Sequence, residues 1–159
     1  GDVYKRQDLV PPMPLFGHGY FTHVTGSTHK ENGLRDVYTP EVHDRLVRRL
    51  HKKIELHKTE IQKWEDYYIE DAEILLVSWG VSARPSLGAV MEGRKKGIKV
   101  GLFIPKTVHP FPGERIKELS KNVQLIIIPE MNLGQVILEV QRFVRDEVPV
   151  IGVNKIGDR

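Results

Sequence analysis

The feature that most constrains this sequence is a regular alternation that begins near residue 64. Four short apolar runs, rich in β-branched residues, start about 25 residues apart, at residues 74–79, 98–104, 123–128 and 148–153. Continuous apolar strands separated by helix-length segments predict a parallel sheet that is covered on both faces. A short aromatic stretch at residues 64–69 is expected to add an antiparallel edge strand.

The segments between the strands have the spacing of amphipathic helices. The first is marked by Leu87, Val90, Met91 and Arg94, the second by Ile116 and Leu119, and the third by Val136, Ile137, Val140, Phe143 and Val144. This spacing places the marked residues of each segment on one helical face. The expected fold class is therefore α/β, with three α/β/α layers and a mostly parallel sheet.

A long helix is predicted ahead of the sheet, over residues 39–63. Thr39 is the expected N-cap and Pro40 the first helical residue. Its expected apolar face consists of Val42, Leu46, Val47, Leu50, Ile54, Ile61 and Trp64. Residues 8–38, in contrast, contain too many prolines and glycines for regular elements but remain apolar. We expect this irregular segment to pack on a partner.

Composition excludes several classes of protein. The chain has 24 basic and 21 acidic residues without a concentrated basic stripe, so a nucleic-acid partner is not expected. It has no cysteine, which excludes disulfides and cysteine-bound iron–sulfur clusters within this chain. The longest apolar run spans only residues 125–129, so no membrane span is expected and a cytoplasmic location is predicted.

Three loops follow strands at the edge where parallel α/β sheets bind ligands or partners. Residues 80–85 form a strand-to-helix turn in which a capping Ser82 and Arg84 could hold an anion at the helix N-terminus, although simple capping is the alternative. Residues 105–112 contain three prolines and Thr107, which suits a rigid docking surface or a substrate contact.

The third loop, residues 129–135, is the most specific feature of the chain. It places Glu130, Asn132 and Gln135 at a strand end where a helix begins, with Gly134 between them. Glu130 has the chemistry of a general base, but no second titratable group is near it in the sequence. Asn132 is the alternative helix cap, with Gln135 closing a capping box. A contact to a neighbouring domain, subunit or ligand is the other interpretation, and it would explain the use of Glu130.

The seven histidines do not indicate a metal site. His43, His51 and His57 are too far apart along the predicted helix to share an ion. His18, His23 and His29 could converge, but the chain has neither a helical HExxH motif nor a thiolate. No G-x-S-x-G motif surrounds any serine, so a hydrolase is not expected. We assign no catalytic or metal-binding residue.

Ordered motifs from about Leu9 to Gly157 resemble the alpha subunit of 2-oxoacid:ferredoxin oxidoreductases, in particular the 2-oxoglutarate branch. They cover residues 17–20, 23–29, 39–43 and 99–102, then Thr107 with residues 110–112, and finally 129–135, 139–142 and 155–157. The resemblance implies a transketolase C-terminal-like domain at residues 64–159, truncated at its end. It also implies that residues 8–38 are the tail of a pyrimidine-binding domain and that 39–63 connect the two. Residues 1–7 match nothing in the family and are expected to be a non-native leader.

The family's chemistry implies cofactors and partners that this chain does not supply alone. Thiamine diphosphate, an iron–sulfur cluster and coenzyme A are implied for the whole complex, with the missing pyrimidine-binding domain, a beta subunit and ferredoxin as partners. The chain alone is expected to be inactive and to bind no cofactor. Alternatives are the same role with 2-oxoisovalerate or pyruvate, or a stand-alone α/β module that binds an anion or nucleotide at the loops containing Arg84 and Glu130.

Overall fold

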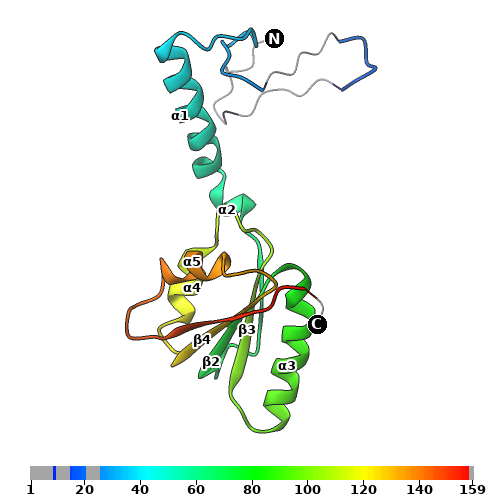
Figure 1. Cartoon of the computed structure of the whole chain (residues 1–159), viewed down its shortest axis with the longest axis vertical. Coiled ribbons are helices and arrows are strands. Elements are labelled where there is room, and N and C mark those ends of the chain that lie inside the picture. The colour runs from blue at the N-terminus through cyan, green and yellow to red at the C-terminus, as the bar shows by residue number, and fades with distance from the viewer. Residues whose placement is uncertain (1–8, 10–14, 21–25, 158–159) are drawn as a thin grey trace. The chain divides into compact units, whose positions relative to one another are not determined.

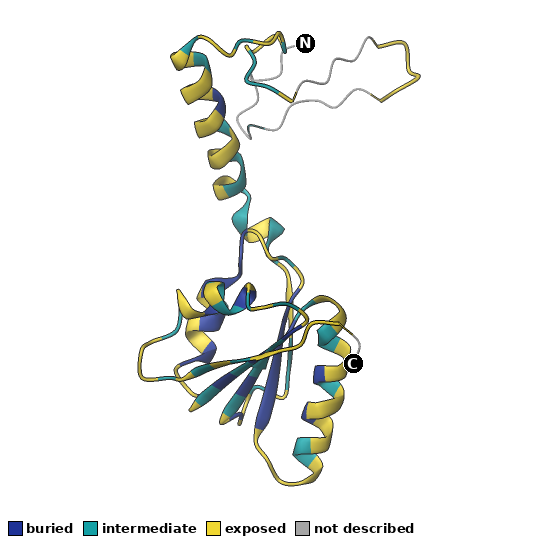
Figure 2. Cartoon of the chain, viewed as in Figure 1, coloured by how far each residue is buried: buried dark blue, intermediate teal, exposed yellow. Residues whose placement is uncertain are grey.

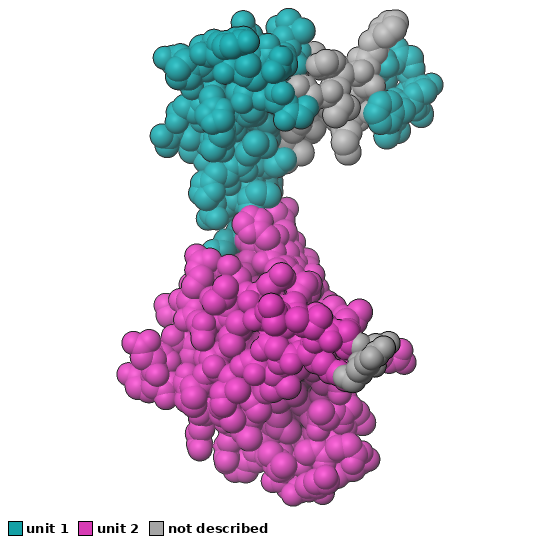
Figure 3. All heavy atoms as spheres, in the orientation of Figure 1, with its two compact units in different colours: residues 1–59 teal, residues 60–159 magenta. Residues whose placement is uncertain are grey.

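The computed structural model describes residue 9, residues 15–20 and residues 26–157. The predicted leader, residues 1–7, lies outside these described residues. The chain forms two compact units, Gly1–Thr59 and Glu60–Arg159 (Figure 3). The second unit contains the predicted sheet and the strand-end loops.

The sheet has five strands in the order β1-β3-β2-β4-β5 (Figure 1). They are β1 (Trp64–Tyr67), β2 (Ile74–Val77), β3 (Val100–Pro105), β4 (Leu125–Glu130) and β5 (Val150–Asn154). Strands β2 to β5 run parallel, and β1 pairs antiparallel with the edge of β3. The prediction of four parallel strands and one antiparallel edge strand is therefore confirmed.

Helices lie on both faces of the sheet. A 3-10 turn, Gly80–Ser82, leads into α3 (Ala83–Lys95) on one face, while α4 (Gly113–Leu119) and α5 (Val136–Gln141) lie on the other (Figure 1). Buried residues gather along the strands between these layers (Figure 2). Phe103 packs with Ile116 and Val140 beneath α4 and α5, whereas Leu102 packs with Val90 beneath α3. The three-layer α/β/α architecture is confirmed.

Three residues of the helical patterns deviate from expectation. Met91 is 46% exposed, although its spacing predicted the apolar face of the helix. Phe143 and Val144 lie beyond the end of α5, yet both still pack on the core. The helix has six residues and is followed by a turn, in which the Phe143 N–H donates to the Val140 carbonyl.

The helix of the first unit is shorter than predicted. It begins at Pro40 after the N-cap Thr39, as expected, but α1 (Pro40–Leu56) ends at Leu56 and a separate turn, α2 (Lys58–Ile61), follows. Trp64 already belongs to β1. The prediction of a continuous helix over residues 39–63 was therefore wrong.

The end of β3 explains why the helical conformation does not continue. The Lys106 and Thr107 N–H groups both donate to the Lys63 carbonyl, at 2.8 and 3.2 Å. The Thr107 hydroxyl donates to the Ile61 carbonyl at 2.8 Å and accepts from the Lys63 N–H at 3.2 Å. Residues 61–63 are thereby bound to β3 before they reach the sheet.

The order of the strands places the loops that follow β2 and β4 beside each other. Strands β2 and β4 are parallel neighbours. The chain leaves β2 towards α3 on one face and leaves β4 towards α5 on the opposite face (Figure 1). In α/β sheets, such a reversal of direction is where ligands or partners bind, at the carboxyl ends of the strands.

Candidate functional site

The carboxyl ends of the parallel strands carry all six residues that the sequence singled out. Arg84 follows β2, Thr107 follows β3, and the remaining four residues lie at the end of β4 and in the loop after it. The latter are Glu130, Asn132, Gly134 and Gln135. Among the described residues, no hydrogen bond or ion pair joins Arg84 or Thr107 to the β4 loop. The structure therefore divides the six residues into three separate groups.

Glu130 is the centre of the β4 group. As the last residue of β4, it follows Ile126 and Ile128 on the sheet face covered by α5, since side chains alternate along a strand. Its side chain is buried, with 3% of the residue exposed. Its carboxylate accepts hydrogen bonds from the N–H groups of Gln135, Val136 and Ile137, at 3.0–3.2 Å. The side-chain amide of Asn132 is the fourth donor, at 2.9 Å.

These hydrogen bonds fix the protonation state of Glu130. Burial works against the charged form, but the donors at Val136, Asn132, Ile137 and Gln135 outweigh it and hold the pKa of Glu130 below its ordinary value. A general base at neutral pH needs a free carboxylate lone pair and a pKa close to that pH. Glu130 has neither, so it is a helix cap rather than a catalytic base.

The details of the capping prediction were wrong. Gln135, not Asn132, occupies the N-cap position of α5, and its own side chain makes no capping bond. The side-chain oxygen of Asn132 (Oδ1) instead accepts from the Gly134 N–H at 2.7 Å, which closes a tight turn. Gly134 has a φ of +103°, a conformation that glycine adopts without a steric cost. The helix is capped from the strand by Glu130, because that carboxylate lies directly beneath the free N–H groups.

Strand β5 holds the same loop from its other side, a contact that the sequence reasoning missed. The Asn154 amide donates to the Asn132 carbonyl at 2.8 Å, and the Lys155 N–H donates to the Glu130 carbonyl at 3.0 Å. The β4 loop is therefore hydrogen-bonded both to the helix that follows it and to the neighbouring strand.

Thr107 and Arg84 differ from the β4 group and from each other. Thr107 is half-buried, and its hydroxyl is used in the two bonds to Ile61 and Lys63 that fix the beginning of β1. Arg84 is exposed in the first turn of α3, and no hydrogen bond or ion pair of its side chain is present among the described residues. Ser82 is the N-cap residue of α3, but it makes no side-chain capping bond.

Exposed apolar side chains in these loops were also missed. Val81, Met131, Leu133 and Ile156 are large, apolar and exposed, and they come from the loops after β2, β4 and β5. A signal was available in the sequence, since each predicted strand-end loop contains a large apolar residue among polar ones.

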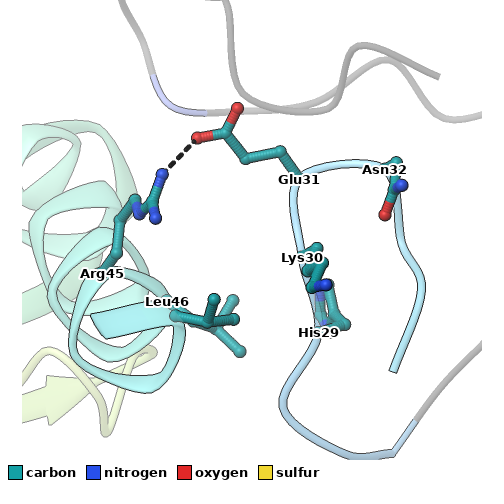
Figure 4. A pocket seen from close by; sticks show the side chains of 7 residues that line it. His29, Lys30, Glu31, Asn32, Arg45 and Leu46 are labelled. Atoms are coloured by element: carbon teal, nitrogen blue, oxygen red, sulfur yellow. Dashed lines mark hydrogen bonds and ion pairs between the residues drawn. The ribbon is translucent and has the colours of Figure 1, made fainter. Parts of the chain in front are cut away.

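The first unit contains a hollow of about 320 Å³ between the turn at residues 29–32 and α1 (Figure 4). Its charged groups are paired: Arg45 contacts Glu31 at 3.1 Å, and Lys30 contacts Asp36 at 3.5 Å. The His29 Nδ1 donates to the Ser27 carbonyl. The hollow therefore offers no convergent free charge for a ligand.

The chain lacks cysteine ligands for an iron–sulfur cluster, and its described part lacks a cluster of metal-ligating side chains. The whole chain has no cysteine to bind an iron–sulfur cluster. In the described part of the chain, no group of three or more His, Cys, Asp or Glu side chains is placed to hold a metal ion. His23, one of the three histidines considered above, lies outside that part. No described helix is long and apolar enough to cross a membrane.

Two solved structures share the fold. The chain superposes with a TM-score of 0.78 on a structure of 2-oxoglutarate:ferredoxin oxidoreductase from Magnetococcus marinus with 2-oxoglutarate, coenzyme A and succinyl-CoA bound. The two are 24% identical, and the match covers 97% of this chain and 27% of that one. A split-gene transketolase matches 60% of this chain and 33% of its own, with a TM-score of 0.53 and 16% identity. The transketolase C-terminal-like fold class is thus confirmed.

Sequence comparison identifies the family. The chain is 46% identical to the 2-oxoglutarate synthase subunit KorA of Methanocaldococcus jannaschii over 154 residues, which is 97% of this chain but 41% of that relative. It is 49% identical to the ketoisovalerate oxidoreductase subunit VorB of Methanothermobacter marburgensis over 73 residues, 46% of this chain and 21% of that relative. The family model of pyruvate:ferredoxin oxidoreductase core domain II matches residues 72–159. The chain therefore belongs to the pyruvate:ferredoxin oxidoreductase core domain II family, among the 2-oxoacid:ferredoxin oxidoreductases that its motifs resemble.

Proposed function

We propose that this chain is the core domain II region of the alpha subunit of a 2-oxoglutarate:ferredoxin oxidoreductase, with a structural and assembly role. The observation that carries the proposal is the 46% identity to a 2-oxoglutarate synthase subunit across 97% of the chain. Because the chain spans only 41% of that relative's length, the activity belongs to the proposal for the whole enzyme.

The chemistry of the strand-end loops supports a role without catalysis. The one buried carboxylate among the candidate residues, Glu130, is saturated by hydrogen bonds from its own loop and helix. Thr107 is committed to the backbone of residues 61–63. Arg84 is available, but a single exposed arginine can bind or orient a charged partner and cannot by itself carry out acid–base chemistry.

In the proposed complex, the cofactors lie in other domains or subunits. Thiamine diphosphate supplies the decarboxylation of the 2-oxoacid, an iron–sulfur cluster passes electrons to ferredoxin, and coenzyme A accepts the acyl group. The domain layout expected from the sequence belongs to the same proposal, with residues 8–38 as the end of a pyrimidine-binding domain, 39–63 as a connection and 64–159 as this domain. A cytoplasmic location and assembly with a beta subunit complete it.

One observation supports a different substrate, a branched-chain 2-oxoacid. The ketoisovalerate oxidoreductase subunit VorB has a higher identity, 49%, but over only 73 residues. We favour 2-oxoglutarate because the similarity to the 2-oxoglutarate synthase subunit extends over 97% of the chain. Pyruvate is supported only by the description of the family model.

The geometry argues against a stand-alone anion-binding module at the β4 loop. An anion at a helix N-terminus needs free N–H groups. In this loop, the Glu130 carboxylate already accepts from the first N–H groups of α5. A nucleotide phosphate would have to displace a buried carboxylate of the same charge.

The test compares the assembled enzyme with the isolated chain. We expect the complete alpha and beta subunits to reduce ferredoxin fastest, by kcat/KM, with 2-oxoglutarate and more slowly with 3-methyl-2-oxobutanoate or pyruvate. The isolated chain should show no turnover and no heat of thiamine diphosphate binding by calorimetry. Micromolar binding of that cofactor by the chain alone would overturn the proposal that thiamine diphosphate is bound by other domains or subunits.

A further inference from the structure

The two ends of the sheet have different chemistry. At the amino-terminal ends of the parallel strands, loops are charged, and the charges pair across them: Lys99 with Glu73 at 2.6 Å and Arg94 with Asp71 at 2.7 Å. Of the large apolar residues in these loops and the adjoining β1–β2 turn, Tyr68 and Ile98 are exposed, each at 45%. The Arg94 guanidinium lies over the Tyr68 ring. This end has the character of a solvated surface.

Every loop at the carboxyl-terminal end contains an exposed apolar side chain. Large exposed side chains project from the loops after β2, β3, β4 and β5; they are Val81, Val108, Met131, Leu133 and Ile156. Leu133 is 84% exposed, Val81 74% and Ile156 68%, so they contribute almost nothing to this domain's own core. A concentration of exposed apolar side chains at one end of a domain indicates a protein–protein interface.

Two basic side chains at this end have no partner, whereas a third, Lys106, is paired with Glu65 at 2.9 Å. Arg84 and Lys155 are exposed, and neither side chain has a hydrogen-bond or ion-pair partner among the described residues. Arg84 lies in the first turn of α3, which has no acidic residue. A cation there opposes the helix dipole. The placement of Arg84 is therefore unfavourable for the isolated domain and becomes favourable only beside a negative group.

We propose that the carboxyl-end surface, defined as Val81, Arg84, Met131, Leu133, Lys155 and Ile156, docks a separate subunit through an apolar patch with carboxylates around it. Two copies of this surface would bring arginine and lysine together, so charge disfavours self-association. An acidic and apolar partner satisfies both the exposed side chains and the two cations. The inference rests on the proposed function, which supplies the beta subunit as that partner.

The hydrogen-bonded β4 loop gives the surface a rigid centre. Met131 and Leu133 flank Asn132, whose side chain and carbonyl are fixed by Glu130, Gly134 and Asn154. The polar residues of the loop thus hold its backbone, while the apolar residues between them face outward. A preordered loop loses little conformational entropy when a partner binds.

The experiment titrates the purified beta subunit into the full-length alpha subunit that contains this chain, by calorimetry. Leu133→Ser and Lys155→Glu are expected to weaken the affinity by at least about tenfold each. Added salt should weaken the wild-type complex more than the Lys155→Glu complex, because one charge contact is already lost. Met91→Ser and Lys121→Glu are matched controls, an exposed apolar residue on α3 and an exposed lysine at the amino-terminal end, and should leave the affinity unchanged.

Each outcome decides between the proposals. Unchanged affinity for both surface variants, with wild-type binding intact, overturns the docking surface and leaves the proposed function standing. Absence of binding by the wild-type alpha subunit overturns the proposed function itself. Self-association of the alpha subunit that is lost in Leu133→Ser, measured by sedimentation, would assign the surface to a second copy and contradict the inference. If Leu133→Ser lowers the melting temperature of the free alpha subunit without changing its affinity for the beta subunit, the surface packs on the subunit's own preceding domain. That result would also contradict the inference.

Discussion

The loops after β4 and β2 leave neighbouring parallel strands at the same edge of the sheet, but they use their charged residue in opposite ways. After β4, the carboxylate of Glu130 turns inward and caps α5 through three backbone N–H groups. After β2, the Arg84 side chain is exposed at the beginning of α3, where it opposes the helix dipole. The first charge stabilises the fold and the second does not.

The difference shows that position in an α/β fold does not determine what a strand-end residue does. Both loops lie where such folds bind ligands or partners. The two charged residues differ in the hydrogen-bond partners that the domain itself provides. Glu130 has four donors within its own loop and helix, and Arg84 has no acceptor among the described residues. A charge without an internal partner is therefore the better indicator of an external contact.

The largest expected effect is the loss of stability on changing Glu130 to glutamine. Charge-assisted hydrogen bonds from one buried and two partly buried N–H groups are lost, and an amide nitrogen is placed against N–H donors. Unfolding should therefore become easier by about 3 kcal/mol. Denaturant unfolding measured by circular dichroism checks this value. A loss below about 0.5 kcal/mol would mean that Glu130 is not the cap of α5.

The pH dependence of the stability of wild type and Glu130→Gln tests whether Glu130 caps α5 as a carboxylate. Because the pKa of Glu130 is lowered in the folded state, its contribution is complete above its unfolded pKa of about 4.3 and is lost as the pH falls through the folded value. The stability difference between wild type and Glu130→Gln should be constant from pH 7 to about pH 5 and shrink below about pH 4. A difference that grows on acidification would contradict the lowered pKa.

A smaller effect is expected at Asn132. Replacement by alanine removes the bonds to the Gly134 N–H and to the Glu130 carboxylate while the main cap remains, so the cost should be about 1 kcal/mol. Thermal unfolding of the second unit in the full chain gives this number. If Asn132→Ala costs as much as Glu130→Gln, the two residues act as one unit and the cap cannot be ascribed to Glu130 alone.

The smallest effect has the opposite sign. Changing Arg84 to glutamate replaces an unfavourable charge in the first turn of α3 by a favourable one, and should stabilise the free protein by roughly 0.3–1 kcal/mol at low salt. Arg84→Gln should lie between the two. A loss of stability in both variants would show that Arg84 has an internal role, and the contrast between the two loops would disappear.

The sequence predicted the sheet well because its strands are uniformly apolar and regularly spaced. Residues 74–77, 100–105, 125–130 and 150–154 form strands within two residues of the predicted starts and ends. The helix before the sheet was predicted too long in part because residues 61–63, at its predicted end, are held by Thr107, about 45 residues further along the chain. Periodicity within a segment contains no information about such a contact.

The candidate site was predicted in part. Its location followed from the alternation of strands and helices. The cap was assigned to Asn132 instead of Glu130 because a capping box places the cap just before the helix. The alternation of Ile126, Ile128 and Glu130 placed the carboxylate on the helix-covered face and could have indicated its role. The bond from Asn154 to the β4 loop could not be predicted, since it depends on the pairing of β4 with β5.

The most direct test of the account measures stability and assembly together for Arg84→Glu and Glu130→Gln in the complete alpha subunit. Unfolding free energy and affinity for the beta subunit are determined in the same buffer. The account predicts that Arg84→Glu is slightly more stable and binds at least about tenfold more weakly, whereas folded Glu130→Gln is less stable and loses less affinity than Arg84→Glu does. Weaker binding by Glu130→Gln together with normal binding by Arg84→Glu would contradict the central claim, which is that Glu130 stabilises the fold and Arg84 contacts the partner.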